Sequence, residues 1–329
     1  MARTVALVGA DSLIGREVRD LLSTSALDLR LIGSADQEAG MLTEVGGEPV
    51  VVGRFDADLA ASAAAVILAG GEDSSRAALQ STQARFIDLT YAGEGDPRAC
   101  LRAPGLEPET MPFPSSSVHV IAHPAAMALA LILGRLHRLS PLARSVANVF
   151  EPASERGSAG LRELEQQSLK LLSFQKLPKA VFDAQAGFNL LSRYGAEAPV
   201  ALERIESRME RHLAALLALS GGAPMPSLRL IQAPVFHGYS CSLWVEFGSN
   251  PGAEAIEQAL SAEPVEVRSG DEEPPSIAGI AGQALISVGA ISSDRHVASA
   301  CWLWLVADNL RLSAEAALAV AGQLAGSAG

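Results

Sequence analysis

The sequence predicts an α/β fold: a doubly wound, mainly parallel sheet, followed by a second half of α+β type. Two observations predict it. Through about the first 120 residues, short apolar segments of strand length alternate with helical segments, as in parallel sheets covered on both faces. From about residue 140, longer strands with alternating polarity and long helices take over, a pattern typical of an α+β domain with a half-buried sheet.

The first half opens with a strand at 3–8, a glycine turn and an amphipathic helix at about 14–24. The segment 92–117 is rich in Pro, Gly, Ser and Glu, which predicts a long loop. Further strands are expected at 29–33, 49–53, 65–69, 85–89 and 118–122.

The second half begins with a helix at about 125–138. The stretch 240–247 alternates in polarity, so we expect it to form an antiparallel pair with the strand at 227–235 and to bury one face. The other elements expected here are strands at 144–150, 285–291 and 300–306, helices at 158–173, 198–219, 253–261 and 313–326, and a loop at 263–283.

Composition limits the class of protein. A chain of 329 residues is long enough for two domains, and 49% hydrophobic with 19% charged residues is typical of a globular protein. The net charge of −12 argues against a nucleic-acid or membrane-surface binder. The apolar runs are too short to span a bilayer, and the start predicts no signal peptide. We therefore expect a cytoplasmic protein.

The three cysteines, Cys100, Cys241 and Cys301, are scattered and odd in number, without the spacing of metal ligands. This arrangement favours a reduced protein without a metal.

A glycine turn, Gly9–Gly15, lies between the first strand and the first helix. In that context Gly9 permits a tight turn, Gly15 permits close packing of helix on sheet, and helix amides face an anion. A packing turn without a ligand is the alternative, and Asp11 would repel a pyrophosphate unless it faces away. The cofactor-binding candidates in the turn are Gly9, Asp11, Ser12, Leu13, Ile14 and Gly15.

The second strand ends near Ser34 and Asp36. An acidic residue here suits a free ribose diol, which favours NAD over NADP because a 2′-phosphate calls for Arg or Lys. The alternative is that Asp36 is a solvated carboxylate in a loop.

Several blocks together resemble the aspartate-semialdehyde dehydrogenase family over nearly the full length. The turn is similar to its Gly-Ala-Thr-Gly-x-x-Gly, with Ser12 in place of the middle glycine. The more specific blocks are 232–240 (Gln-Ala-Pro-Val-Phe-His-Gly-Tyr-Ser), Ser287-Val288-Gly289 and 307–311 (Ala-Asp-Asn-Leu-Arg); weaker ones are 69–76 and 87–90.

The resemblance implies a Rossmann-like nucleotide-binding domain, 1–123 with 309–329, and a dimerisation and substrate domain, 124–308, hence a homodimer. It implies an NAD(P) site that includes Gly70, Gly71 and Asn309. In the family a cysteine thiolate forms a thioester with an acyl phosphate, and NADPH reduces it to an aldehyde.

The family's four central residues are all replaced. Its cysteine corresponds to Ala126, its substrate-binding arginine to Gln232, its acid/base histidine to Tyr239 and its glutamine to Glu151. Alanine has no nucleophile, an amide lacks the charged fork of arginine, and tyrosine is a poor base near pH 7. Substrate contacts of the family's long helix correspond to Arg204 and Arg208.

A divergent branch of the family, the Usg-type homologues, is more similar still and also lacks the cysteine. Three functions remain open: a catalytically degenerate homologue, an active NAD(P)-dependent oxidoreductase with altered chemistry, and a nucleotide-binding regulatory partner of another enzyme. The resemblance alone does not decide whether the chain is an enzyme, or what ligand it takes.

Two further residues are candidates for chemistry. Cys241 lies two positions after Tyr239, so a regular strand would put both on one face with His237 and allow a relocated Cys–His pair. The alternative is that Cys241 is a small buried hydrophobe. His123 precedes a helix, where it is expected to bind an anion or to act as a local cap or packing residue.

Overall fold

The computed structural model describes residues 4–33, 40, 42–45, 47–81, 83–108, 110–270 and 272–326. By its internal contacts the chain divides into two compact units, Met1–Ala122 with Ser313–Gly329, and His123–Leu312. Each unit contains a six-stranded sheet of its own. Ser34 and Asp36 lie outside the described residues, so the ribose contact remains a prediction.

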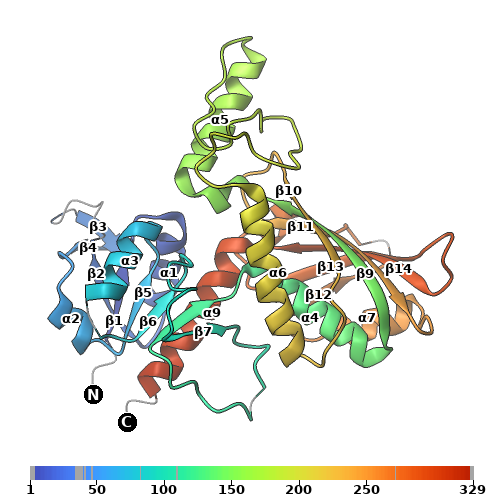
Figure 1. The fold of residues 1–329 in the computed structure, drawn as a ribbon, viewed down its shortest axis with the longest axis horizontal. Helices are drawn as coiled ribbons and strands as arrows, with labels where there is room; N and C mark the ends of the chain where they lie inside the picture. Colours follow the sequence, from blue (N-terminus) through green and yellow to red (C-terminus); the bar gives the residue numbers. More distant parts are fainter. Residues whose placement is uncertain are drawn as a thin grey trace. The chain divides into compact units, whose positions relative to one another are not determined.

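The sheet of the first unit is parallel throughout and has the order β2-β1-β5-β6-β8-β7. Its central strands are apolar and fully buried, as expected where helices cover both faces (Figure 1). The strands are β1 (Thr4–Val8), β2 (Asp28–Ile32), β5 (Ala65–Leu68), β6 (Phe86–Asp88), β7 (Ala99–Arg102) and β8 (Val118–Ile121).

Three features of this unit differ from expectation. The segment 92–117 is not all loop, because it contains the edge strand β7. The strand expected at 49–53 is β4 (Glu48–Val51), which pairs with β3 (Leu42–Val45) in a separate hairpin. Two helices were not expected, α2 (Ala57–Ser62) and α3 (Glu72–Ser81). Both are short, with 6 and 10 residues, so their periodicity is a weak signal.

Helix α1 (Leu13–Ser23) starts at a capping serine, Ser12, and buries Val18 and Leu22. Val8, Val66, Leu68, Phe86 and Val120 belong to one buried cluster of this unit, with Leu59 of α2 packed against it. The turn between β1 and α1 is thus held by a continuous apolar core beneath it.

The second unit contains a mixed sheet of order β10-β9-β11-β14-β13-β12. The prediction that 227–235 and 240–247 form an antiparallel pair is wrong. The strand β9 lies between them, parallel to β10 and antiparallel to β11. Alternation fixes the buried face of a strand but not its neighbour. The strands are β9 (Leu142–Glu151), β10 (Ser227–Gln232), β11 (Tyr239–Phe247), β12 (Val265–Arg268), β13 (Ile286–Ser293) and β14 (Ala300–Ala307).

The helices of this unit lie mostly where the sequence predicts them. Between 263 and 283 a short strand and a short helix, β12 and α8, replace part of the expected loop. The helices are α4 (Pro124–Leu139), the 3-10 turn η1 (Ala153–Arg156), α5 (Gly157–Leu172), α6 (Leu202–Leu219), α7 (Ala253–Leu260) and α8 (Ile277–Ile280). The closing helix, α9 (Asn309–Gly326), begins in this unit and ends in the first.

The mixed sheet has one fully buried face and one that is partly exposed. Along β11 every second residue from Tyr239 to Phe247 is buried, as the alternation predicts. Helices α4, α6 and α7 pack against this sheet, and α4 packs against both of the other two. On the other face, Phe150 and Trp304 contact each other, and Trp302 is 39% exposed. No helix among the described residues is long and apolar enough to cross a membrane.

Candidate functional site

The glycine turn of the first unit is packed so tightly that two of its glycines are obligatory. Gly9 has φ +84°, and a Cβ there would lie 2.3 Å from Cα of Gly70. A Cβ at Gly15 would lie 2.1 Å from the carbonyl oxygen of Gly9. The turn after β1 therefore contacts, backbone to backbone, the segment that follows β5.

Ser12 acts as a helix cap. Its Oγ accepts a 2.9 Å hydrogen bond from the amide of Gly15 and donates a 2.6 Å bond to the carbonyl of Ala69. The side chain thus points toward the end of β5 and ties the turn to it. Asp11 lies 3.9 Å from the guanidinium of Arg19, so its charge is partly balanced by a residue of α1.

The turn lies at a topological switch point. Strand β1 has β2 on one side and β5 on the other, and the chain turns from one direction to the other at β1. In open parallel sheets the crevice at such a point, beyond the carboxyl ends of the strands, is where ligands bind. Gly9 and Gly15 follow β1 there, and Gly70 and Gly71 follow β5.

In the second unit, Ala126 lies in the first turn of α4 and is completely buried. The residue before this helix, His123, makes no side-chain cap, so the expected capping role is not seen. Its ring packs on Tyr239, with 3.4 Å between His123 Nε2 and the hydroxyl, and its amide donates to Nδ1 of His212. Burial, and then the nearby His212, lower the pKa of His123 well below its usual range.

Gln232 is fully engaged inside the protein. Its Nε2 donates to the carbonyl oxygens of Glu151 and Ala233, both at 2.9 Å. Its Oε1 accepts a 2.6 Å hydrogen bond from the hydroxyl of Tyr194, and the side chain is 0% exposed. In this conformation Gln232 has no donor left for a substrate carboxylate.

Glu151, at the end of β9, is the centre of this buried network. Its Oε1 lies 3.1 Å from Nη2 of Arg156 and 3.4 Å from the hydroxyl of Tyr194. Its Oε2 is buried without a hydrogen-bond partner in the described part of the chain. Burial raises the pKa of Glu151 to about 7, although Arg156 opposes the shift. The group can therefore hold a proton near neutral pH.

A second carboxyl group lies beside it in η1. Burial raises the pKa of Glu155, against the influence of Arg156 and of hydrogen bonds from Asn309 and Tyr239. The amide of Asn309 donates to Glu155 Oε1 at 2.8 Å and accepts from the backbone of Gly238 at 3.1 Å. Asn309, expected to line the cofactor pocket, thus joins η1 to the start of β11.

Sequence reasoning missed Arg156, Tyr194 and His212. Arg156 left a signal, because two adjacent charged residues separate an expected strand from an expected helix. Tyr194 left none, since it lies 38 positions from its partner Gln232 in a loop without periodicity. The less secure candidates on α6 differ: Arg208 is partly buried and contributes to the electrostatics of His123, whereas Arg204 is exposed.

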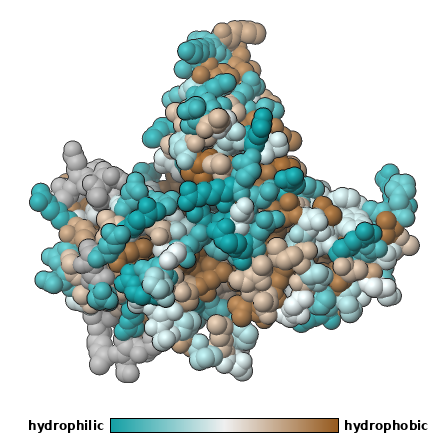
Figure 2. Space-filling model, in the orientation of Figure 1, coloured by the Kyte–Doolittle hydropathy of each residue, from teal (hydrophilic) through white to brown (hydrophobic). Residues whose placement is uncertain are grey.

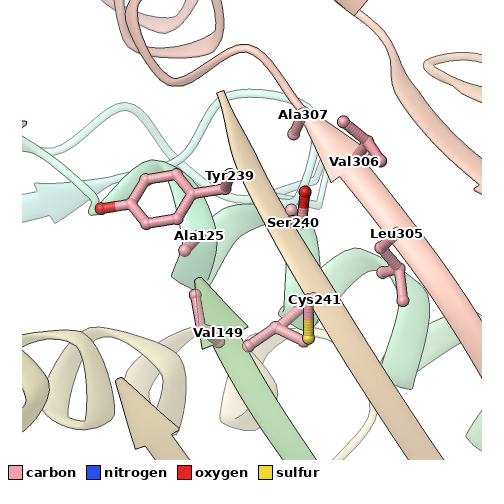
Figure 3. Close-up of a pocket in the computed structure, with 10 residues that line it drawn as sticks. Ala125, Val149, Tyr239, Ser240, Cys241, Leu305, Val306 and Ala307 are labelled. Atoms are coloured by element: carbon pink, nitrogen blue, oxygen red, sulfur yellow. The ribbon is translucent and has the colours of Figure 1, made fainter. Parts of the chain in front are cut away.

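A relocated Cys–His pair is not formed. Cys241 does share the buried face with Tyr239, but burial raises the pKa of its thiol to about 12. Figure 3 shows it among apolar side chains such as Val149 and Leu305, beside a cavity of about 20 Å³. His237 is exposed and precedes β11, because Gly238 at φ +82° interrupts the extended backbone. The cavity has room for about one water molecule.

The described residues contain no group of three or more His, Cys, Asp or Glu that could hold a metal ion. The second unit thus provides a proton-holding carboxyl, a guanidinium beside it and the neutral imidazole of His123. It provides no accessible thiol.

Comparison with known proteins agrees with this fold. Residues 133–312 match the model of the semialdehyde dehydrogenase dimerisation domain. A USG-1 protein homolog of Pseudomonas aeruginosa is 29% identical over 97% of this chain and 96% of its own. The fold class predicted from the sequence is confirmed.

Solved structures are similar over the whole chain. Aspartate semialdehyde dehydrogenase II of Vibrio cholerae superposes with a TM-score of 0.83 at 22% identity, covering 98% of both chains. The aspartate semialdehyde dehydrogenase of Candida albicans, solved with NADP, has a TM-score of 0.67 at 14% identity, again covering 98% of both chains. At these identities the likeness concerns the fold.

Proposed function

Because this chain belongs to the semialdehyde dehydrogenase family, we propose that it is a homologue that has lost the cysteine-dependent reaction and kept a dinucleotide site. One observation carries the proposal. The position expected for the nucleophile holds Ala126, a fully buried methyl group in the first turn of α4. A thioester cannot form on a methyl group.

The surroundings of Ala126 support the same conclusion. Both N–H groups of the Gln232 side chain donate to backbone carbonyls, so Gln232 does not replace a substrate-binding arginine. Tyr239 contacts a neutral His123 in place of an acid/base pair. Cys241 is buried and keeps its proton at neutral pH. No side chain described here takes over the missing role.

The test is an assay of phosphate-dependent oxidation of aspartate semialdehyde with NADP and with NAD. We expect no turnover by the native chain. Ala126→Cys alone is expected to stay inactive, whereas the quadruple variant with Gln232→Arg, Tyr239→His and Glu151→Gln tests whether the scaffold regains activity. If the native chain turns over this substrate and the turnover survives Cys241→Ser, the proposal that the chain has lost the reaction is wrong.

For the cofactor we propose NAD(P) at the switch point of the first unit, held by the amides of Leu13 and Ile14 at the start of α1. Those first-turn amides have no partner within the helix, and the dipole favours an anion there. At Gly9 and Gly70 the two backbones meet with no side chain between them. Asp36 favours NAD over NADP.

Isothermal titration of the native chain with NAD and with NADP tests this site. Binding of NAD at least tenfold tighter than NADP supports the ribose contact of Asp36, and Asp36→Ser should reduce the difference. If neither dinucleotide gives a binding heat, the proposed site is wrong and the glycine turn serves only in packing.

We also propose a homodimer that uses the partly exposed face of the mixed sheet. Phe150 and Trp304 pack together on it, and the indole N–H groups of Trp244 and Trp302 both donate to Asp294. An ordered aromatic surface of this kind is typical of interface cores. Light scattering should give twice the chain mass, and Trp302→Asp should weaken the dimer.

A second function is favoured by Glu151 alone. A buried carboxyl with a pKa of about 7 is tuned as general acids and bases are, which suits direct hydride transfer between a dinucleotide and an alcohol or carbonyl without a covalent step. If the native chain oxidises or reduces any small aldehyde or alcohol, Glu151→Gln should abolish the turnover and leave dinucleotide binding intact.

A further inference from the structure

The loop between β7 and β8, residues 103–117, borders a cavity that the proposed function leaves unused. Its volume is about 590 Å³, within the range of roughly 300–1,000 Å³ that is typical of small-molecule sites. All of its lining residues belong to the first unit. In the sheet, β5, β6 and β8 lie between β7 and β1, the strand that precedes the glycine turn. The cavity is therefore separate from the proposed dinucleotide site.

The apolar wall of this cavity is made of flat or polarisable side chains, and within the described residues no Val, Leu or Ile lines it. The wall residues are Pro104, Pro108, Met111, Pro112, Phe113 and Pro114. Aromatic rings stack on one another and contact thioethers favourably, and proline offers a rigid pyrrolidine ring. In Figure 2 the loop lies at the lower edge of the view and shows mainly pale side chains of intermediate hydropathy. The wall thus favours a flat aromatic ligand.

The wall is formed before any ligand binds. The centre of the Phe113 ring lies 4.9 Å from the guanidinium carbon of Arg102 and 5.4 Å from the centre of the His119 ring. The proline side chains have no rotamer freedom to lose. Phe113 and Met111 nevertheless each remain 39% exposed. A ligand that covers this apolar surface gains the free energy of burial without first ordering the wall.

The remaining side of the cavity, which we call the polar floor, consists of Arg102, Glu107 and Gln323. Nη2 of Arg102 donates to Oε2 of Glu107 at 2.8 Å and to Oε1 of Gln323 at 2.7 Å. One nitrogen therefore holds the carboxylate and the amide side by side. In the described part of the chain, Oε2 of Glu107 accepts only this bond and Nε2 of Gln323 has no partner. The floor thus offers a free acceptor site beside a free donor.

The charges of the polar floor cancel. Although burial opposes the shift, hydrogen bonds from Arg102 lower the pKa of Glu107, so the carboxyl is ionised beside the guanidinium. His119, whose Nδ1 lies 3.2 Å from Nη1 of Arg102, is neutral, because burial and then Arg102 lower its pKa to about 4. The other described lining residues carry no charge. Since burying a charge without a counter-charge is costly, the cavity favours a neutral ligand.

We propose that this cavity binds a neutral purine of the adenine type, as the free base or the nucleoside. Its flat face packs on Phe113 and the proline rings. Its amino group donates to Oε2 of Glu107, and the ring nitrogen next to that group accepts from Nε2 of Gln323. An adjacent donor and acceptor are what a glutamine side chain and a carboxylate recognise on the edge of a base. The inference goes beyond the proposed function and does not depend on the dinucleotide site.

The six methionines of the chain allow the site to be located by NMR. Adenosine is titrated into the native chain with carbon-13-labelled methionine methyl groups. The ring current of the bound purine should shift the methyl signal of Met111 in a saturable manner. Met225, which is 41% exposed in the second unit, is the reference and should not shift. The variants Met111→Leu and Met225→Leu assign the two signals.

Two further titrations test the polar floor. Gln323→Leu should weaken adenosine binding at least about tenfold, because the ligand nitrogen loses its donor. Gln258→Leu, on an exposed glutamine of α7, is the matched control and should bind as the native chain does. The methyl spectrum also shows that each variant is folded. An adenosine whose amino group carries two methyl groups should bind the native chain weakly, because it cannot donate to Glu107.

The outcomes separate this site from the dinucleotide site. If adenosine gives no shift of Met111 up to its solubility limit, or gives a binding heat without that shift, the purine site in the cavity is wrong. Equal shifts of Met111 and Met225 would mean non-specific stacking and would also overturn it. If the dimethylated adenosine binds as tightly as adenosine, the contact with Glu107 is wrong, and so is the assignment to a purine. Gln323→Leu should leave the titration with NAD unchanged, so either site can fail alone.

Discussion

The hydroxyl of Tyr194 donates a 2.6 Å hydrogen bond to Oε1 of Gln232, and both side chains are buried. This contact joins the loop after α5 to the end of β10. It also completes the hydrogen bonding of an amide whose two N–H groups already bind backbone carbonyls. The residue expected to replace a substrate-binding arginine has thereby become part of the protein interior.

Tyr194→Phe should lower the free energy of unfolding by about 1–3 kcal/mol, because it leaves the buried Oε1 of Gln232 without a donor. Urea denaturation measures the loss. The double variant Tyr194→Phe with Gln232→Met should lose less than the sum of the two single variants. Strict additivity would mean that the two side chains do not interact in solution.

The stability of the chain should depend on the protonation of Glu151. In the folded chain burial raises its pKa to about 7, whereas an exposed glutamate titrates near 4.3. The folded chain therefore holds a proton that the unfolded chain releases, so the free energy of unfolding falls as the pH rises from about 4.5 to 7 and levels off above. The fall is at most roughly 4 kcal/mol, at about 1.4 kcal/mol per pKa unit.

Glu151→Gln should reduce this fall in denaturation curves measured between pH 4.5 and 8, and what remains comes from Glu155, whose pKa is also raised by burial. His123 changes the free energy of unfolding in the opposite direction, so the quantity to compare is the difference between the native and variant curves, in which the contribution of His123 cancels. Its lowered pKa favours unfolding below about pH 6.5 in both proteins. Glu203→Gln, on an exposed residue of α6, is the control. Parallel curves for native and Glu151→Gln chains would contradict the raised pKa.

Gly9→Ala should destabilise the first unit by more than 3 kcal/mol and abolish dinucleotide binding, as its Cβ would lie 2.3 Å from the Gly70 backbone. Gly47→Ala is the matched control. Gly47 has nearly the same φ, +87° against +84°, but has no heavy atom within 4 Å of the added Cβ. It should cost only about 1 kcal/mol. Equal losses at both sites would show that φ alone matters.

Thiol chemistry should separate the three cysteines. Cys241 and Cys301 are buried and Cys100 is partly exposed, and the pKa of Cys241 is raised to about 12 by burial. Iodoacetamide at pH 8 should therefore label Cys100 first and leave Cys241 unmodified until urea unfolds the chain. Rapid labelling of Cys241 in the native chain would reopen the relocated nucleophile.

A buried ion pair should secure the edge of the first sheet. Arg102, 1% exposed, donates from Nε and Nη2 to both oxygens of Glu107 at 2.8 Å, and Nη2 also reaches Gln323 of α9. Glu107→Gln should lower the free energy of unfolding by about 3–5 kcal/mol, because it leaves a buried guanidinium unbalanced. Arg102→Met with Glu107→Leu should lose much less. A larger loss in the double variant would contradict this explanation.

Much of the fold follows from local patterns in the sequence. Apolar strands that alternate with helices predict the parallel sheet, and the alternation from Tyr239 to Phe247 predicts which face of β11 is buried. The order of the strands in the sheet could not be predicted, because the alternation of a strand indicates which side chains are buried and not which strand lies beside it. For that reason β9, which lies between β10 and β11, was not foreseen.

The sequence by itself determined the family resemblance and the fold class, and it placed Ala126 where the resemblance leads us to expect a nucleophile, since each depends on which residue types stand in order along the chain. Only the tertiary structure decided what became of the surrounding polar groups. Gln232, Tyr194, Glu151 and Arg156 come from segments up to 81 residues apart and meet inside the protein. Hydrogen bonds hold Gln232 in the interior, and burial raises the pKa of Glu151. No local pattern in the sequence encodes either effect.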